Sequence, residues 1–499
     1  MLTDKELDFV REALQMARRQ GAQKARATLS QSVEDLVATL DGEVDRVTHC
    51  ADRSLSLALF VDGRFGSYST NKLEPAALEA FIAKAVEATR MVAPDPFRDL
   101  PDPARCCRDA ITGDELGLVD PAREAITPAE RQQIALNASV LYASRGGSSP
   151  DALLDEAEAA AASGNLATLG IVRGGTSSEA KRWGPKDVSG GWLPCSEGTG
   201  RAEFEIISEE GEYSDSIYET VVMDTNGVCC VHRETSFDYG VEITIESGGE
   251  KYSGYWWDAS SDHKELDAPA CGRRALERAV GQIGSGPVHS GQYTAVIDAE
   301  MASKVVSPLL RALSGYAIQQ NSSFLMDSVG KQVFPEGLTL LDVPRIPGQT
   351  CSKYFDSEGV ATVEAPVIER GVVREYFLNT YMAGKMQLAP TVEDATRPKV
   401  LPWPRPGLDR DAILQACGSG ILVTDFNGGN SNPVTGDFSY GIEGYLFEEG
   451  RIVRPVSGML MTGNLLALWS QLLFAGDDAR PCQTKLIPTL AFGEVDFSG

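Results

Sequence analysis

The fold of the last third of the chain follows from one stretch, Asn430-Ser-Asn-Pro-Val-Thr-Gly-Asp-Phe-Ser-Tyr-Gly-Ile-Glu-Gly-Tyr-Leu-Phe-Glu-Glu-Gly-Arg-Ile-Val-Arg-Pro-Val456. Its centre predicts a strand over 444–447, and the turn signal Glu449–Gly450 closes a hairpin. Helices are expected over 301–314 and 464–474. Further short strands are predicted over 293–297, 338–341, 360–367, 372–377 and 420–425. Residues 289–499 are therefore expected to form a mostly antiparallel β domain with peripheral helices.

The first 103 residues predict an N-terminal α/β region with antiparallel strands and helices. Thr3 and Glu6 form a capping box at the start of a helix, and Asp62–Gly63 is a hairpin signal. Strand character is seen over 24–31, 36–40 and 54–59, and an apolar face of helical period runs over 75–90. Prolines at 94, 96 and 101 then break regular structure. The fold class expected for the whole chain is α+β.

Residues 104–288 are expected to form a middle region. A helix should begin at Thr127, strands of period two should lie between 204 and 246, and a second helix is predicted over 273–283. A short helix is also predicted over 151–163, and 164–200 is expected to be a long surface excursion.

Composition restricts the class of protein. The 499 residues include 45 basic and 71 acidic side chains, so the formal net charge is −26, which disfavours contact with nucleic acid. No run of 18 apolar residues is present, so no membrane-spanning helix is expected, and the first residues do not resemble a signal peptide. Ten cysteines in a chain of this length are ordinary usage, and we expect a cytoplasmic protein.

The sequence offers few metal ligands. None of its four histidines forms a zinc-binding helix motif, and no nucleophile elbow or Walker loop is present. In Cys229-Cys230-Val231-His232, a strand would put Cys230 and His232 on one face. A tetrahedral zinc site needs three or four protein ligands, so buried thiols beside a polar edge residue are the simpler interpretation.

Two polar loops of the last third are the candidates for binding. Phe355-Asp-Ser-Glu-Gly359 carries two carboxylates, and Asn427-Gly-Gly-Asn430 precedes the stretch quoted above. Asp, Asn and Gly at such positions often serve turns alone, because they satisfy backbone groups and tolerate positive φ. Loops at sheet ends are also where rigid scaffolds display functional residues.

Several of these segments together resemble the TldD/PmbA family. The 430–456 stretch and Thr462-Gly-Asn-Leu465 are similar to its C-terminal signature, and Phe355–Val360, Glu369–Gly371 and Gly63–Thr70 follow the order of the family's motifs. The resemblance spans nearly the whole chain and is weakest over 145–215, which appears as diverged or inserted sequence.

The resemblance implies a metal-free role for this chain. The TldD branch carries an H-E-x-x-x-H zinc motif on a helix, whereas the PmbA (TldE) branch lacks it and pairs with the first branch as a heterodimeric peptidase. The corresponding helix here, 301–314, contains no histidine and no glutamate. No cofactor is therefore expected in this chain, and zinc is expected only in a TldD-like partner. In the absence of that partner, a homodimer is expected.

The resemblance also suggests which residues act. The candidates for binding an extended peptide are Asp356, Glu358, Gly359, Asn427, Gly428, Gly429 and Asn430. The candidates for the subunit interface, within the glycine-rich and apolar region 420–470, are Phe438, Tyr440, Gly463 and Asn464. Two alternatives stay open: a stand-alone hydrolase or modified enzyme with unrecognised catalytic residues, and a non-enzymatic protein-interaction module, to which the family's older name, modulator of DNA gyrase, belongs.

Overall fold

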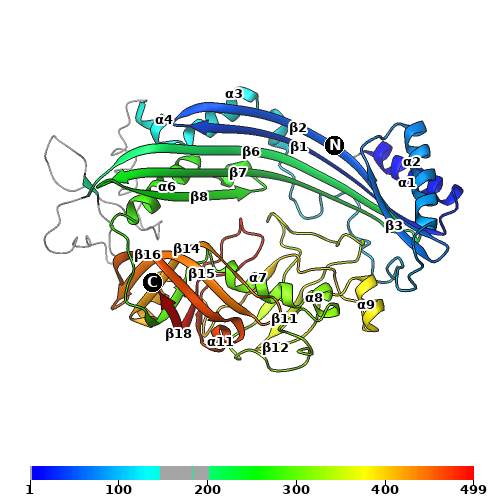
Figure 1. Ribbon diagram of the computed structural model, residues 1–499. Helices are drawn as coiled ribbons and strands as arrows, with labels where there is room; N and C mark the ends of the chain where they lie inside the picture. The colour runs from blue at the N-terminus through cyan, green and yellow to red at the C-terminus, as the bar shows by residue number, and fades with distance from the viewer. Residues whose placement is uncertain (1–2, 146–181, 184–201) are drawn as a thin grey trace.

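The computed structural model describes residues 3–145, 182–183 and 202–499. Long strands from the first half of the chain arch over a C-terminal domain, and helices lie at both ends of the arch (Figure 1). The helix expected over 151–163 and most of the excursion expected over 164–200 lie outside the described residues. No helix in the described part of the chain combines the length and the apolar character that a membrane crossing requires.

The arch is one antiparallel sheet of six strands in the order β3-β2-β1-β6-β7-β8. The expected regions 1–103 and 104–288 both contribute strands to it, because β1 pairs with β6. Its strands are β1 (Lys24–Leu40), β2 (Glu43–Val61), β3 (Arg64–Thr70), β6 (Glu205–Asp224), β7 (Cys229–Ser247) and β8 (Glu250–Ser260). A two-stranded pair, β4 (Arg182–Trp183) and β5 (Ala202–Glu203), lies outside this sheet.

Local turn chemistry joins these strands. The predicted hairpin at Asp62–Gly63 is confirmed, with φ of +52° and +71°. A second turn of the same kind, Asp41–Gly42, joins β1 to β2 and was missed. The prediction of two separate strands over 24–31 and 36–40 was wrong, because the residues between them pair with β2 on one side and with β6 on the other.

Helices cover the two ends of the sheet. At one end, α1 (Asp4–Arg19) and α2 (Pro75–Arg90) pack their apolar faces on β1, β2 and β6, and α1 begins with the predicted capping box. At the other end lie α3 (Pro128–Asn137), α4 (Val140–Arg145) and α6 (Ala268–Gly281). The helix expected over 273–283 starts earlier, because Asp267 caps it by accepting a hydrogen bond from the Ala270 N–H.

The C-terminal domain is built around a five-stranded barrel. Its strands follow the order β16-β15-β14-β9-β18, and pairing of β16 with β18 closes it. The helix expected over 464–474 is shorter, α11 (Leu465–Ser470), and the chain continues as β17 (Leu472–Ala475) on the outside of β18. The barrel strands are β9 (Gly291–Ile297), β14 (Gly420–Ser431), β15 (Asp437–Glu448), β16 (Arg451–Asn464) and β18 (Leu490–Ser498).

Helices and a small sheet surround the barrel. Helix α7 (Ser303–Ala312) buries Val305, Val306 and Leu309 in the main core, and α8 (Gly315–Gln319), α9 (Thr380–Met386) and α10 (Arg410–Cys417) lie around it. The strands expected over 360–367 and 372–377 were misplaced: the chain turns tightly between Phe355 and Ala361 and forms only short strands afterwards. The small sheet holds β10 (Leu340–Asp342), β11 (Ala365–Glu369), β12 (Val372–Val373) and β13 (Pro398–Val400).

Candidate functional site

A cavity of about 270 Å³ lies between the arched sheet and the C-terminal domain. We call it the interdomain cavity. One wall is formed by β8 and α6, and the other by residues 298–300, α10, the facing parts of β14 and β15, and residues 478–480. Helix α6 joins the two walls: Gly254 of β8 lies directly against its backbone, and Gly281 at its end lies against the hydroxyl of Tyr445 in β15.

Arg480 connects the two walls. It forms ion pairs with Glu300 and with Asp258, the latter at 3.1 Å, and donates a hydrogen bond to the Trp257 carbonyl at 2.7 Å. Burial raises the pKa of Glu300, although the nearby guanidinium opposes that shift. Glu300, three residues before the first residue of α7, is therefore bound to an arginine.

A second arginine organises the floor of the cavity. Arg410 at the start of α10 pairs with Asp298 and with Asp411, each at 3.2 Å. Its backbone N–H donates to Asp478, which also accepts hydrogen bonds from the Thr489 N–H and hydroxyl. Buried carboxylates with this many partners hold the adjacent loops in place.

A second, shallower cavity of about 670 Å³ lies on the sheet surface beside the first. Tyr255, which is 49% exposed, lines both cavities. Five carboxylates and one arginine line the second cavity, so it favours positively charged ligands. The charged residues concerned are Asp45, Arg46, Glu210, Glu212, Asp238 and Glu242.

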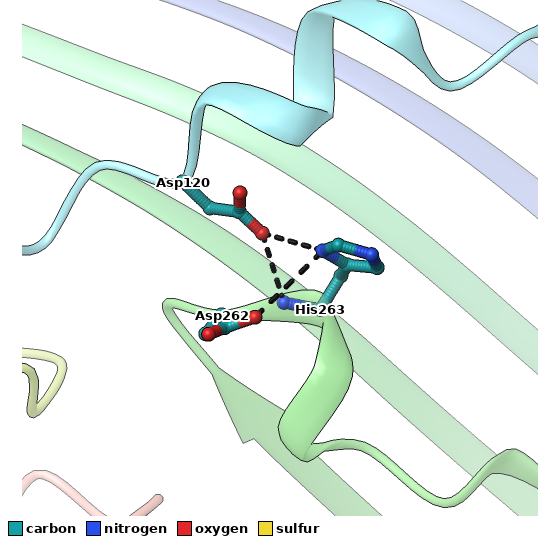
Figure 2. Close-up of side chains that lie close together, drawn as sticks. All are labelled: Asp120, Asp262 and His263. Carbon is teal, nitrogen blue, oxygen red and sulfur yellow. Dashed lines mark hydrogen bonds and ion pairs between the residues drawn. The ribbon is translucent and has the colours of Figure 1, made fainter.

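The residues at α7 do not fit a zinc ion. Ser303–Ala312 contains no His, Cys, Asp or Glu, and Glu300 is paired with Arg480. Within the described ranges, one group of three potential ligands converges, with ligand atoms within 4.8 Å of one another, and it lies elsewhere: Asp120, Asp262 and His263 (Figure 2).

That group is already hydrogen-bonded internally. His263 Nδ1 lies 2.5 Å from Asp120 Oδ2, which also accepts the His263 N–H at 3.2 Å (Figure 2). Asp120 caps the turn 121–125 and Asp262 caps the turn 263–265. Hydrogen bonding to His263 and to the backbone lowers the pKa of Asp120, although burial opposes it. The group links two segments of the chain by ordinary capping chemistry.

The cysteine–histidine segment of β7 also lacks a convergent ligand set. Cys230 is buried, and its thiol donates to the Cys107 carbonyl at 3.4 Å. His232 Nε2 lies 3.3 Å from Glu234 Oε2, while Cys229 is exposed. Cys230 belongs to a small apolar cluster with Cys106 and Cys107, which is the environment of a buried structural thiol.

Asp356 and Glu358 both bind backbone. Asp356 accepts hydrogen bonds from the N–H groups of Glu358, Val360 and Glu393 at 2.9, 2.9 and 3.2 Å, and burial raises its pKa to about 6. Glu358 accepts the N–H and hydroxyl of Thr380 at the start of α9.

Two further contacts fix the same turn. Glu358 lies 3.6 Å from Arg26 of β1, and Gly359, at φ +81°, accepts the Cys107 N–H through its carbonyl. The turn thus holds α9 and the Cys107 segment close to the sheet. None of these residues lines the interdomain cavity.

The Asn427–Asn430 segment lies at the exposed end of β14. A bulge interrupts its pairing with β15 between Phe426 and Gly429, where Gly428 and Gly429 have φ of +130° and +82°. Asn427 Nδ2 donates to Glu443 Oε1 at 3.1 Å, and Glu443 lines the interdomain cavity. No hydrogen bond or ion pair between described residues joins this segment to Asp356 or Glu358.

The four interface candidates lie close together on β15 and β16. Phe438 and Tyr440 are 5% and 1% exposed, and their rings stack 5.1 Å apart in the barrel core. Gly463 is exposed and pairs with Phe438, while Asn464 caps α11 and donates to Asp437 at 2.9 Å. The two aromatic side chains are therefore covered by this chain itself.

Sequence reasoning missed the interdomain cavity. Its charged residues come from six separate segments, and Arg274 appears in the sequence only as part of a short basic pair. The side chains that line it have no common spacing, so no sequence signal could have found them.

Comparisons with known proteins cover most of the chain. Three domains of the PmbA/TldA metallopeptidase family match it: domain 1 over 27–89, the central domain over 187–283 and the C-terminal domain over 290–499. The metalloprotease PmbA of Escherichia coli O157:H7 is 25% identical over 479 residues, which cover 93% of this chain and 91% of that protein. A metalloprotease PmbA homolog of Haemophilus influenzae is 27% identical over 261 residues, 52% of this chain and 56% of that protein.

Solved structures show the same relationship. A Bacteroides thetaiotaomicron protein described as a modulator of DNA gyrase is 33% identical, with a TM-score of 0.82 and 100% of both chains covered. TldE from Thermococcus kodakarensis is 17% identical and has a TM-score of 0.74 over 98% of this chain and 100% of that one, a likeness of fold. This chain belongs to the PmbA/TldD metallopeptidase family.

Proposed function

We propose that this chain is a metal-free subunit, similar to PmbA and TldE, of a TldD/TldE-type metallopeptidase complex, and that it encloses and aligns extended peptides for cleavage or maturation. The observation that carries the proposal is α7, which offers no zinc ligand, together with the binding of Glu300 by Arg480. A zinc peptidase needs imidazole ligands and a carboxylate base near the metal. Zinc and the cleavage chemistry would then belong to a TldD-like partner.

The peptide path is proposed to pass the Asn427–Asn430 segment. Its glycines are exposed, so its main chain is open to an extended ligand, and Asn427 bonds to the cavity residue Glu443. Asp356, Glu358 and Gly359 stay in the proposal as residues that set the position of α9 and the adjoining loop.

The partner surface is proposed to lie on the outer side of β15 and β16. Phe438 and Tyr440 would support this surface from within, while Val453 and Leu460, 42% and 46% exposed, would make the contact together with Gly463 and Asn464. Substituting Leu460→Glu should weaken assembly with a TldD-like partner, or self-association in its absence, in light scattering. Met91→Glu, at an exposed site after α2, is the matched control.

A stand-alone hydrolase is the second candidate, because one buried carboxyl in the interdomain cavity is suited to acid–base work. Burial raises the pKa of Glu277 to about 7, in the range of a general acid or base at neutral pH. This candidate predicts peptide hydrolysis by the isolated chain that Glu277→Gln abolishes.

Metal analysis with reconstitution tests the main proposal. The isolated chain should contain no stoichiometric zinc and show no chelator-sensitive peptidase activity. The complex with a TldD-like partner should contain zinc and show that activity. Equimolar zinc in the isolated chain, lost on Cys230→Ala or His232→Ala, would overturn it. The nine cysteines that the structure describes are all free thiols, which supports a reducing compartment, and the cytoplasm is part of the proposal.

A further inference from the structure

Two buried groups of the interdomain cavity lack a hydrogen-bond donor. Glu277 of α6 is 8% exposed, lines the cavity, and makes no hydrogen bond or ion pair with any described residue. Gln282, which follows α6, is 7% exposed and lines the same cavity. Its Oε1 has no partner among the residues that the structure describes, while its Nε2 donates to the Gly444 carbonyl at 3.5 Å. Buried polar groups are nearly always paired, so two acceptors facing one cavity indicate that a donor belongs there.

Two arginines of the same cavity form no ion pair with a described carboxylate, although Arg274 acts electrostatically on Glu277 and Arg278 on Glu300. Arg274 and Arg278, one helical turn apart on α6, lie over the ring of Trp256 with guanidinium carbons 4.7 and 4.8 Å from its centroid. Among the described residues neither pairs with a carboxylate, and Arg278 makes only a 3.5 Å contact with the Tyr255 carbonyl. Arg480 lies over the same ring at 4.5 Å and, in contrast, has both Glu300 and Asp258 as partners.

Arginine that is fixed against an aromatic ring is well suited to bind a carboxylate. Stacking on the indole restricts the guanidinium, so little side-chain freedom is lost when its N–H groups bind a second planar group. Two such groups one turn apart repel each other, and an anion that binds both would reduce that repulsion. The cavity therefore provides acceptors for a cation and donors for an anion on one helix.

We propose that the interdomain cavity binds a zwitterion with a free α-ammonium and a free carboxylate, either an amino acid or a very short peptide. The ammonium binds Glu277, the Oε1 atom of Gln282 accepts a further hydrogen bond from the ligand, and the carboxylate binds Arg274 and Arg278. The cavity of about 270 Å³ equals the liquid volume of about nine water molecules, which is enough room for a ligand of dipeptide size.

The raised pKa of Glu277 agrees with this assignment. Burial raises the pKa of Glu277 more than Arg273 and Arg274 lower it, so the carboxyl is partly protonated at neutral pH. A bound ammonium would favour the ionised form. The inference deepens the proposed function, since free amino acids and short peptides are the products of peptide cleavage, but binding itself requires no partner subunit.

The test is calorimetric titration of the isolated chain with four probes: alanine, alanyl-alanine, N-acetyl-alanyl-alanine and alanyl-alanine amide. We expect alanine or alanyl-alanine to bind, and both blocked dipeptides to bind at least tenfold more weakly. The ratio of the dissociation constants of alanine and alanyl-alanine shows whether the cavity prefers an amino acid or a dipeptide. Equal binding of the blocked and free dipeptides, or no heat with any probe at millimolar concentration, would overturn the assignment.

Variants assign the two ends of the ligand. Arg278→Gln should weaken binding of the free dipeptide at least tenfold. Glu277→Gln should remove the preference for the dipeptide with a free amine over its acetylated form. Arg19→Gln, exposed at the end of α1 and outside the cavity lining, is the matched control and should bind normally. Thermal melting checks folding, and Arg274→Gln replaces Arg278→Gln if the latter unfolds. Unchanged binding in the folded cavity variants contradicts the inference, whatever the outcome of metal analysis and reconstitution.

Discussion

Arg480 binds Glu300, three residues before the first residue of α7, and its second guanidinium nitrogen lies 3.1 Å from Asp258 at the end of β8. One side chain thus joins the C-terminal segment, the approach to α7 and the arched sheet. The pair is well shielded, with side-chain exposures of 16% for Arg480 and 4% for Glu300.

Removing that arginine should destabilise the protein strongly. Arg480→Met leaves Glu300 buried without its cation, and breaking a buried ion pair in this way costs about 3 to 5 kcal/mol. The measurement is the free energy of unfolding in urea. Adding Glu300→Gln should recover part of the loss, because the uncompensated charge is then gone. A single variant as stable as the parent would show that the pair does not hold these segments together.

Glu277→Gln should stabilise the protein at high pH. The pKa of Glu277 is about 7 in the folded state against 4.5 for an ordinary glutamate, so the folded state holds its proton more tightly. Ionisation of this carboxyl therefore does not lower the free energy of unfolding below pH 4.5. The loss grows between pH 4.5 and 7 and reaches about 3 kcal/mol above pH 7.

The measurement is the thermal midpoint of variant and parent across this range. The gain from Glu277→Gln should be largest at pH 8 and absent at pH 4. Glu250→Gln, at an exposed site in β8, is the control and should show no such trend. An equal effect at both pH values would mean that the carboxyl is not held in a buried, unpaired state.

Local features of the fold could be read from the sequence, and long-range ones could not. The turns at Asp62–Gly63 and Glu449–Gly450, and the capping box at Thr3 and Glu6, depend on neighbouring residues and were predicted correctly. The strand over 32–35 was missed because its pattern is polar, and its conformation comes from pairing with β2 and β6.

The same distinction between local and long-range features applies to the candidate site. Asn427 was a candidate for peptide binding from its loop chemistry and from the family resemblance; in the structure it contacts Glu443, which lines the cavity, and its role in binding stays a prediction. Glu277, Arg278 and Arg480 were not identified, because only the folding of α6, β8 and the last segment brings them to one cavity. An isolated glutamate on a helix gives no sign that it will be buried without a partner.

The bulge in β14 should depend on Gly429. A Cβ there would lie 1.9 Å from the Ser439 carbonyl oxygen, and φ is +82°, so Gly429→Ala forces the hairpin to shift. We expect a loss of about 1 to 3 kcal/mol in the free energy of unfolding, together with lower peptide turnover by the reconstituted complex. Gly286→Ala, where nothing lies within 4 Å and φ is ordinary, is the control. Normal turnover in a destabilised Gly429→Ala variant would remove the bulge from the proposed peptide path.

Asp356 and Glu358 could either stabilise a turn or bind the peptide. Two nearly isosteric substitutions distinguish these roles. In Asp356→Asn the amide cannot accept hydrogen bonds on both sides, so one of three backbone N–H groups loses its partner, and in Glu358→Gln the start of α9 is held less firmly. Because these contacts are internal, we expect each variant to lose about 1 to 3 kcal/mol in the free energy of unfolding and to melt at a lower temperature. Turnover by the reconstituted complex should stay normal. Val363→Ala, at an exposed site just after the same turn, is the control for general disturbance of the loop. Unchanged melting with turnover reduced through KM would instead assign both carboxylates to the bound peptide. Each residue must be measured separately, since Asp356 could support the turn while Glu358, which is next to Arg26, orients a ligand.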